Sequence, residues 1–162
     1  MASPGAAVVR ASWLGTALFV VTAVAAAVAP TAFEPVALAV AIALFAAGCA
    51  LFVWALLLMA GRSRTDELQL AQVWFLAGLP APAHVRWTLL GSLAAEVVAG
   101  LATAAARPYT SLAAGVLVPV YGLALCGLWA VRHGGFPPRA PAPGRRGRDL
   151  RSADADEGEQ EP

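Results

Sequence analysis

The sequence predicts an all-α fold: a polytopic membrane protein of four transmembrane helices in two antiparallel hairpins, with a short interfacial helix and a disordered C-terminal tail. Of the 162 residues, 59% are hydrophobic and 13% are charged, whereas about a quarter of the residues in a soluble domain are charged. Four apolar runs are each about 20 residues or longer, and a helix of that length spans about 30 Å of hydrocarbon.

The first hairpin is predicted from the apolar runs at residues 12–32 and 36–60. The link between them contains Pro30, Glu34 and Pro35. Proline biases the residue before it away from helix, so we expect this link to form the turn.

The first run also resembles a secretory signal peptide, with an Ala-Val-Ala cleavage site at residues 27–29. The run is long for a signal core, and Pro30 would directly follow the cut. We therefore expect a retained helix, with cleavage as the alternative.

A short interfacial helix is predicted at residues 66–78. Asp66 and Gln69 have capping-box spacing, and Gly78 before two prolines is a stop signal. Its apolar side consists of Leu70, Val73, Trp74 and Ala77. This side is too short to cross the membrane but suits the headgroup region, with Trp74 as anchor. The alternative is a helix packed on the ends of the other four.

The second hairpin is predicted from residues 87–106 and 111–131. Glu96 is the only charged residue in the first of these two runs. A carboxyl group at the centre of a bilayer is costly, so it usually faces a bundle interior or a water-filled path. Four intramembrane residues are therefore polar site candidates: Glu96, Tyr121, Ser92 and Thr103.

Glu96 is expected to face the bundle interior. Desolvation there disfavours the anion, so we expect a protonated carboxyl that donates a hydrogen bond. Tyr121 lies at a similar depth and is the expected partner. In one interpretation Glu96 is a structural donor that locks the hairpin. In the other it takes up and releases a proton coupled to solute transport.

Small residues predict close helix packing in the second hairpin. They are Gly91, Ala95, Ala99 and Gly100 on its first helix, and Gly115, Pro119 and Gly122 on its second. Pro119 cannot donate to the Gly115 carbonyl, so we expect a kink and an unpaired carbonyl there. Gly91, Ala95 and Ala99 equally suit packing within one chain or homo-oligomer formation.

The arginines predict the topology. With four crossings, ten of the eleven fall on one face and only Arg107 on the other, so we expect both termini on the cytoplasmic side of a bacterial cytoplasmic membrane. Residues 1–138 form the transmembrane domain, and residues 139–162 are expected to be a disordered tail because they have little apolar content. Its basic part is a candidate site for anionic lipid headgroups: Arg139, Arg145, Arg146 and Arg148.

Chemistry-bearing motifs are missing from the sequence. It contains no hydrolase, metalloprotease or P-loop signature, so we expect neither an enzyme nor a cofactor. His84 and His133 without a third ligand make a poor metal site. Cys49 and Cys126 are expected to be small buried packing residues. The net charge of +1 argues against a nucleic-acid partner.

The last hairpin resembles a group of small uncharacterised four-helix membrane proteins of actinobacteria. The stretches that carry the likeness are residues 101–112, 115–123 and 127–139, with a weaker likeness at 64–68 and 75–78. The resemblance implies four helices in the cell membrane and no known activity.

The predicted function is that of a non-enzymatic accessory or scaffold protein of the bacterial cell membrane. Its partners would be the lipid bilayer and another, unidentified membrane protein. The alternative is a small proton-linked transporter or channel subunit that uses Glu96. A structure distinguishes the two by showing either a polar cavity that reaches Glu96 or a dry packed seam.

Overall fold

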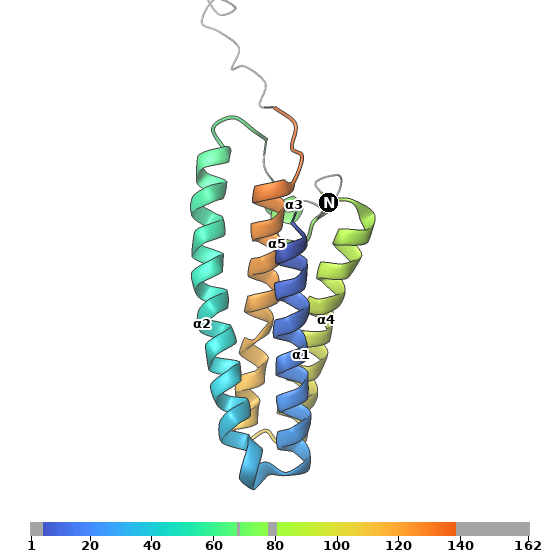
Figure 1. The fold of residues 1–162 in the computed structure, drawn as a ribbon. Coiled ribbons are helices and arrows are strands. Elements are labelled where there is room, and N and C mark those ends of the chain that lie inside the picture. The colour runs from blue at the N-terminus through green and yellow to red at the C-terminus, as the bar shows by residue number, and fades with distance from the viewer. Residues whose placement is uncertain (1–4, 68, 78–80, 139–162) are drawn as a thin grey trace, which may run out of the picture.

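The computed structural model describes residues 5–67, 69–77 and 81–138, whose regular elements are all helical (Figure 1). They are α1 (Ala6–Val28), α2 (Pro30–Arg62), α3 (Leu70–Trp74), α4 (Ala83–Ala106), the 3₁₀ helix η1 (Ser111–Leu117) and α5 (Pro119–His133). The predicted tail, with Arg139, Arg145, Arg146 and Arg148, lies outside the described residues.

Four helical segments of the described chain are long and apolar enough to cross a membrane: α1, α2, α4 and the combined segment Ser111–His133. Their outer surfaces carry large apolar side chains that are more than half exposed, including Leu14, Val28, Leu57 and Val98. Apolar exposure on this scale suits contact with lipid tails. The chain is therefore a multi-pass membrane protein, as its composition predicts.

The turn between α1 and α2 is tighter than predicted. Ala29 alone separates the two helices, and residues 30–35 belong to α2. Pro30 occupies the first position of α2, where the missing N–H costs nothing. Pro35 lies inside the helix and removes only one backbone hydrogen bond. The expectation of a proline-bracketed link is therefore wrong.

The predicted interfacial helix at 66–78 is also corrected. Among the residues of this stretch that the structure describes, only Leu70–Trp74 is helical, and α3 packs against α5. Val73 is fully buried, and the Trp74 ring stacks on Phe52 with 4.1 Å between ring centroids. The expected capping residue Asp66 instead forms an ion pair with Arg62. Trp74 is thus a packing residue rather than an exposed anchor.

Helix α5 is the centre of the bundle, in contact with α1, α2, α3 and α4. All of its residues from 124 to 131 are buried. Small residues allow this burial: at Gly48 of α2, a methyl group would lie 2.7 Å from the backbone nitrogen of Tyr121. Cys126 is buried here as expected, whereas Cys49 is exposed on α2.

The Arg62 side chain joins the ends of α2 and α5. Its Nη1 donates hydrogen bonds to the carbonyl oxygens of Val131 (2.6 Å) and Gly134 (3.3 Å), while Nε donates to Asp66 Oδ2 (2.9 Å). The guanidinium also lies 5.1 Å from the ring centroid of Phe136. Cations near a helix C-terminus satisfy its free carbonyls. Arg62 therefore caps the C-terminus of α5 and is also one of the arginines on which the predicted membrane orientation rests.

The two ends of the bundle differ in charge. We call one the arginine-rich end; it contains Arg10, Arg62, Arg64, Arg86 and Arg132, because α1 and α4 begin there and α2 and α5 end there (Figure 1). The opposite end, which we call the Arg107 end, contains Arg107 after α4 and Glu34 near the start of α2. Glu34 Oε1 accepts hydrogen bonds there from the Ser111 hydroxyl (2.6 Å) and N–H (3.3 Å).

Candidate functional site: the Glu96 junction

The fourth crossing is interrupted at Val118, between η1 and α5. The Val118 N–H donates to the Gly115 carbonyl (3.1 Å), and the Tyr121 N–H donates to the Val118 carbonyl (2.8 Å). Both are tight bonds of the 3₁₀ type, which bypass the missing donor of Pro119. The prediction of an unpaired Gly115 carbonyl is therefore wrong. The interruption instead directs the Gly122 N–H toward α4.

Glu96 occupies this interruption and is fully buried. Its Oε2 accepts a hydrogen bond from the Gly122 N–H at 3.1 Å, and its Oε1 lies 2.7 Å from the Thr16 hydroxyl oxygen. One side chain of α4 thus connects α1 to the first turn of α5. A methyl group on Gly122 would lie 2.5 Å from Oε2, so the approach requires glycine. We call Glu96, Thr16 and Gly122 the Glu96 junction.

The Thr16 hydroxyl has two acceptors within reach. Its oxygen lies 2.7 Å from Glu96 Oε1 and 2.9 Å from the Ser12 carbonyl oxygen of its own helix. A hydroxyl has a single proton to donate. A protonated Glu96 carboxyl can donate to Thr16, which then donates to the Ser12 carbonyl. With an ionised Glu96, the Thr16 hydroxyl donates to the carboxylate or is shared between the two acceptors, while the Ser12 carbonyl keeps the helical N–H of Thr16.

A second polar contact lies one helical turn from the junction. The hydroxyls of Ser12 on α1 and Ser92 on α4 share a buried hydrogen bond. Ser12 and Thr16 are four residues apart, as are Ser92 and Glu96, and this spacing keeps both pairs on facing sides of their helices. The seam between α1 and α4 therefore holds two successive polar pairs.

Tyr121 is not the partner of Glu96. It lies beside Gly122 in the chain, but its hydroxyl donates to the Ala11 carbonyl of α1 at 2.9 Å. Thr103 also stays apart, because its hydroxyl donates to carbonyls of its own helix, those of Ala99 (2.9 Å) and Gly100 (3.0 Å). Of the four predicted polar candidates, Ser92 and Glu96 both contact hydroxyls of α1, whereas the hydroxyls of Tyr121 and Thr103 donate to backbone carbonyls.

The predicted packing residues divide into two groups. Gly100 and Gly115 meet closely, since a methyl on Gly100 would lie 2.7 Å from the Gly115 carbonyl oxygen. A methyl on Gly91 would meet nothing within 4 Å. Gly91 therefore makes no close contact within the described chain, and homo-oligomer formation is the alternative that is left for it. Ala95 and Ala99 are partly buried.

Sequence reasoning missed Ser12, Thr16 and Gly48. The available signal was the spacing of four residues between Ser12 and Thr16, which matches the spacing on α4. As for metals, no cluster of three or more potential ligands occurs in the part of the chain that the structure describes.

Comparisons with protein-family models, with curated proteins and with solved structures find no match for this chain. Its function is therefore inferred from its own residues.

Proposed function

We propose that the protein is a non-enzymatic scaffold or accessory protein of the bacterial cytoplasmic membrane, which acts through contact with another membrane protein. The observation that carries this proposal is that both oxygens of the Glu96 carboxyl have partners within the chain. The carboxyl is fully buried, and both of its oxygens are in contact with groups of the same chain. A carboxyl held in this way fixes the positions of α1, α4 and α5.

The alternative function is a small proton-linked transporter or channel subunit. The two polar pairs of the α1–α4 seam favour it, since hydroxyl and carboxyl groups can relay protons. Proton exchange also requires that water reach the carboxyl. Glu96 lines neither the cavity between α1 and α4 nor the smaller one beside Phe19 and Gly115, which supports the scaffold over the transporter.

In the proposed topology α1 is retained and both termini are cytoplasmic. Helices α1 and α2 form one hairpin, and α4 and α5 form the other. The support is the charge difference between the arginine-rich end and the Arg107 end, because arginines are retained on the cytoplasmic side. Retention of α1 is supported by its two polar contacts with α4, from Ser12 and Thr16.

The test compares Glu96→Gln with Glu96→Leu in purified protein. A glutamine amide can donate to Thr16 and its oxygen can accept from Gly122, so we expect Glu96→Gln to unfold at the wild-type detergent concentration. Leucine leaves the Gly122 N–H without an acceptor, and we expect a loss of about 1–3 kcal/mol. Thr16→Val removes the same α1 contact, with Thr16→Ser as the matched control that keeps the hydroxyl.

The same variants are then reconstituted in liposomes with an internal pH dye. The scaffold proposal expects no proton flux that depends on Glu96. A pH-dependent flux that Glu96→Gln abolishes while the fold is intact would establish the transporter instead. A Glu96→Leu protein as stable as the wild type would show that the junction does not hold the helices together.

A further inference from the structure

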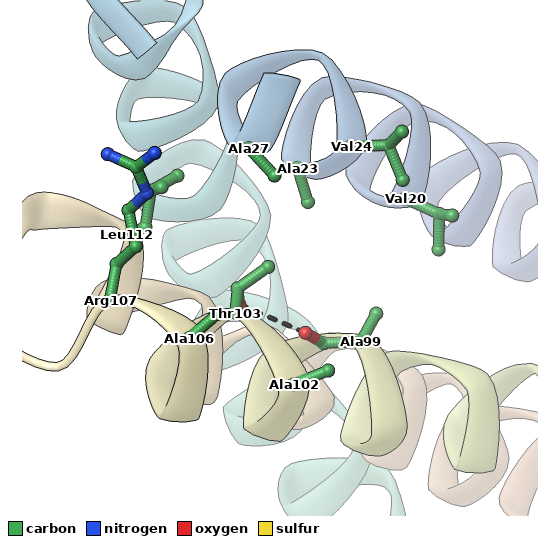
Figure 2. Close-up of a pocket in the computed structure, with 10 residues that line it drawn as sticks. All are labelled: Val20, Ala23, Val24, Ala27, Ala99, Ala102, Thr103, Ala106, Arg107 and Leu112. Carbon is green, nitrogen blue, oxygen red and sulfur yellow. Dashed lines mark hydrogen bonds between the residues drawn. The ribbon is translucent and has the colours of Figure 1, made fainter. Parts of the chain in front are cut away.

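A cavity of about 470 Å³ lies between α1 and α4 near the Arg107 end (Figure 2). Five of its lining residues are alanines, two are valines, and Leu112 of η1 closes one end. Figure 2 shows the alanine and valine side chains of the two helices pointing toward one another across the gap. Small side chains on both helices leave a space that the chain does not fill, which we call the alanine groove.

The walls of the alanine groove between α1 and α4 offer no unpaired hydroxyl group to an occupant. Thr103 is its only hydroxyl residue, and that hydroxyl already donates to the carbonyls of Ala99 and Gly100. The dashed line in Figure 2 shows the first of these bonds. An apolar guest is therefore the chemically matched one.

The length of the groove corresponds to one leaflet of a bilayer. On α4 it extends from Ala99 to Ala106, with Arg107 directly after the helix, and seven helical steps of about 1.5 Å give about 10 Å. Half of a hydrocarbon core of about 30 Å is about 15 Å. The groove thus covers most of the depth of one leaflet, and it ends where headgroups begin.

Arg107 supplies a charge at that end. Figure 2 shows its guanidinium beside Leu112 at the end of the groove. The side chain is exposed, and its guanidinium makes no hydrogen bond or ion pair with another residue that the structure describes. Glu34, the nearby acid of this end, already accepts two hydrogen bonds from Ser111. The guanidinium is therefore available to an external anion.

We propose that the alanine groove binds one acyl chain of a phospholipid, whose phosphate is held by Arg107. A guanidinium donates two parallel hydrogen bonds to a phosphate, and the acyl chain covers apolar wall that otherwise faces an unfilled gap. Charge, groove length and wall chemistry all point to this occupant. This inference does not rest on the role of Glu96.

A second copy of the chain is the competing occupant, because small residues also admit a helix. A two-fold dimer presents the same surface from both chains. A dimer through this groove would bury an arginine from each chain, whereas a lipid brings a phosphate to the Arg107 guanidinium. Charge complementarity therefore favours the lipid.

The experiment is native mass spectrometry of full-length protein released from nanodiscs that contain phosphatidylglycerol. We expect the wild type to retain one lipid through delipidation. Arg107→Gln should retain it at least about tenfold less, since a charged hydrogen bond contributes about that factor. Ala102→Phe should also reduce retention by filling the groove, while Arg107 is intact.

Two matched controls are available. Arg64→Gln removes an arginine from the opposite end, and Ala94→Phe adds the same bulk to an exposed position of α4 outside the groove. Both should retain the lipid as the wild type does, and circular dichroism should show that all four variants are folded.

Several results would overturn the proposal. One is equal lipid retention in the Arg107→Gln and Arg64→Gln proteins. Another is retention that Ala102→Phe leaves unchanged. A third is a dimer in lipid-free detergent that Ala102→Phe dissociates, which would make a second copy the occupant.

Discussion

The crossing of α2 and α5 at Gly48 gives the sharpest test of the packing. A methyl group on Gly48 would lie 2.7 Å from the backbone nitrogen of Tyr121 and 2.8 Å from its Cα. These are backbone atoms in a buried helix, so they cannot rotate away as the end of a side chain can. The two helices must separate to admit the methyl group, and we expect Gly48→Ala to destabilise the protein.

The magnitude follows from a comparison with Gly91→Ala. Both glycines lie within long helices, and replacing glycine by alanine favours a helix by about 1 kcal/mol in either place. That gain cancels between the two variants. Gly91 has nothing within 4 Å of its methyl position, whereas overpacking costs about 1–3 kcal/mol. We therefore expect Gly48→Ala to be about 1–3 kcal/mol less stable than Gly91→Ala.

The assay is equilibrium unfolding in mixed micelles with a rising fraction of denaturing detergent, followed by circular dichroism and tryptophan fluorescence. Two protein concentrations are needed, because self-association through Gly91 would make its midpoint depend on concentration. Equal midpoints for the two variants would refute a close crossing of α2 and α5 at Gly48.

Two further predictions use the same assay. Arg62→Ala removes the donors to the last carbonyls of α5, so it should lower stability by about 1–3 kcal/mol, while Arg64→Ala should change it by less than about 0.5 kcal/mol; equal effects would contradict the capping role. Trp74→Ala should cost about 3–5 kcal/mol because the ring is 8% exposed, and Trp87→Ala, at 69% exposed, less than about 1 kcal/mol. A small loss for Trp74→Ala would indicate an interfacial anchor instead.

The spans could be read from the sequence because hydropathy is a sum over about 20 residues, and no detail of packing changes that sum. The residues at which the helices begin and end could not be predicted as well. Prolines predict a break between α1 and α2, but Pro30 fits the first position of a helix and Pro35 costs one hydrogen bond. At Pro119 the helix does break. The break is tolerated in mid-membrane because neighbouring helices supply contacts for the backbone groups that it frees.

The partners of Glu96 were not predictable from local sequence. Depth follows from counting residues, and Tyr121 does lie beside Gly122. The direction of the Tyr121 side chain depends on which helices are neighbours, and the sequence around Tyr121 does not contain that information. Thr16 is one of several small hydroxyl residues in apolar helices, and only the position of α1 against α4 gives it a role. Gly48 likewise resembles Gly91 in sequence context but not in surroundings.

The Glu96 junction has a consequence for how the chain is made. Ribosomes deliver α1 first, so Thr16 is already in the bilayer when α4 arrives with its carboxyl. A carboxyl group at mid-helix makes the insertion of α4 more costly, and a hydrogen bond with the Thr16 hydroxyl offsets part of this cost. The second donor, the Gly122 N–H, emerges only with the last helix. Biogenesis of the bundle is therefore complete only when α5 has entered the membrane.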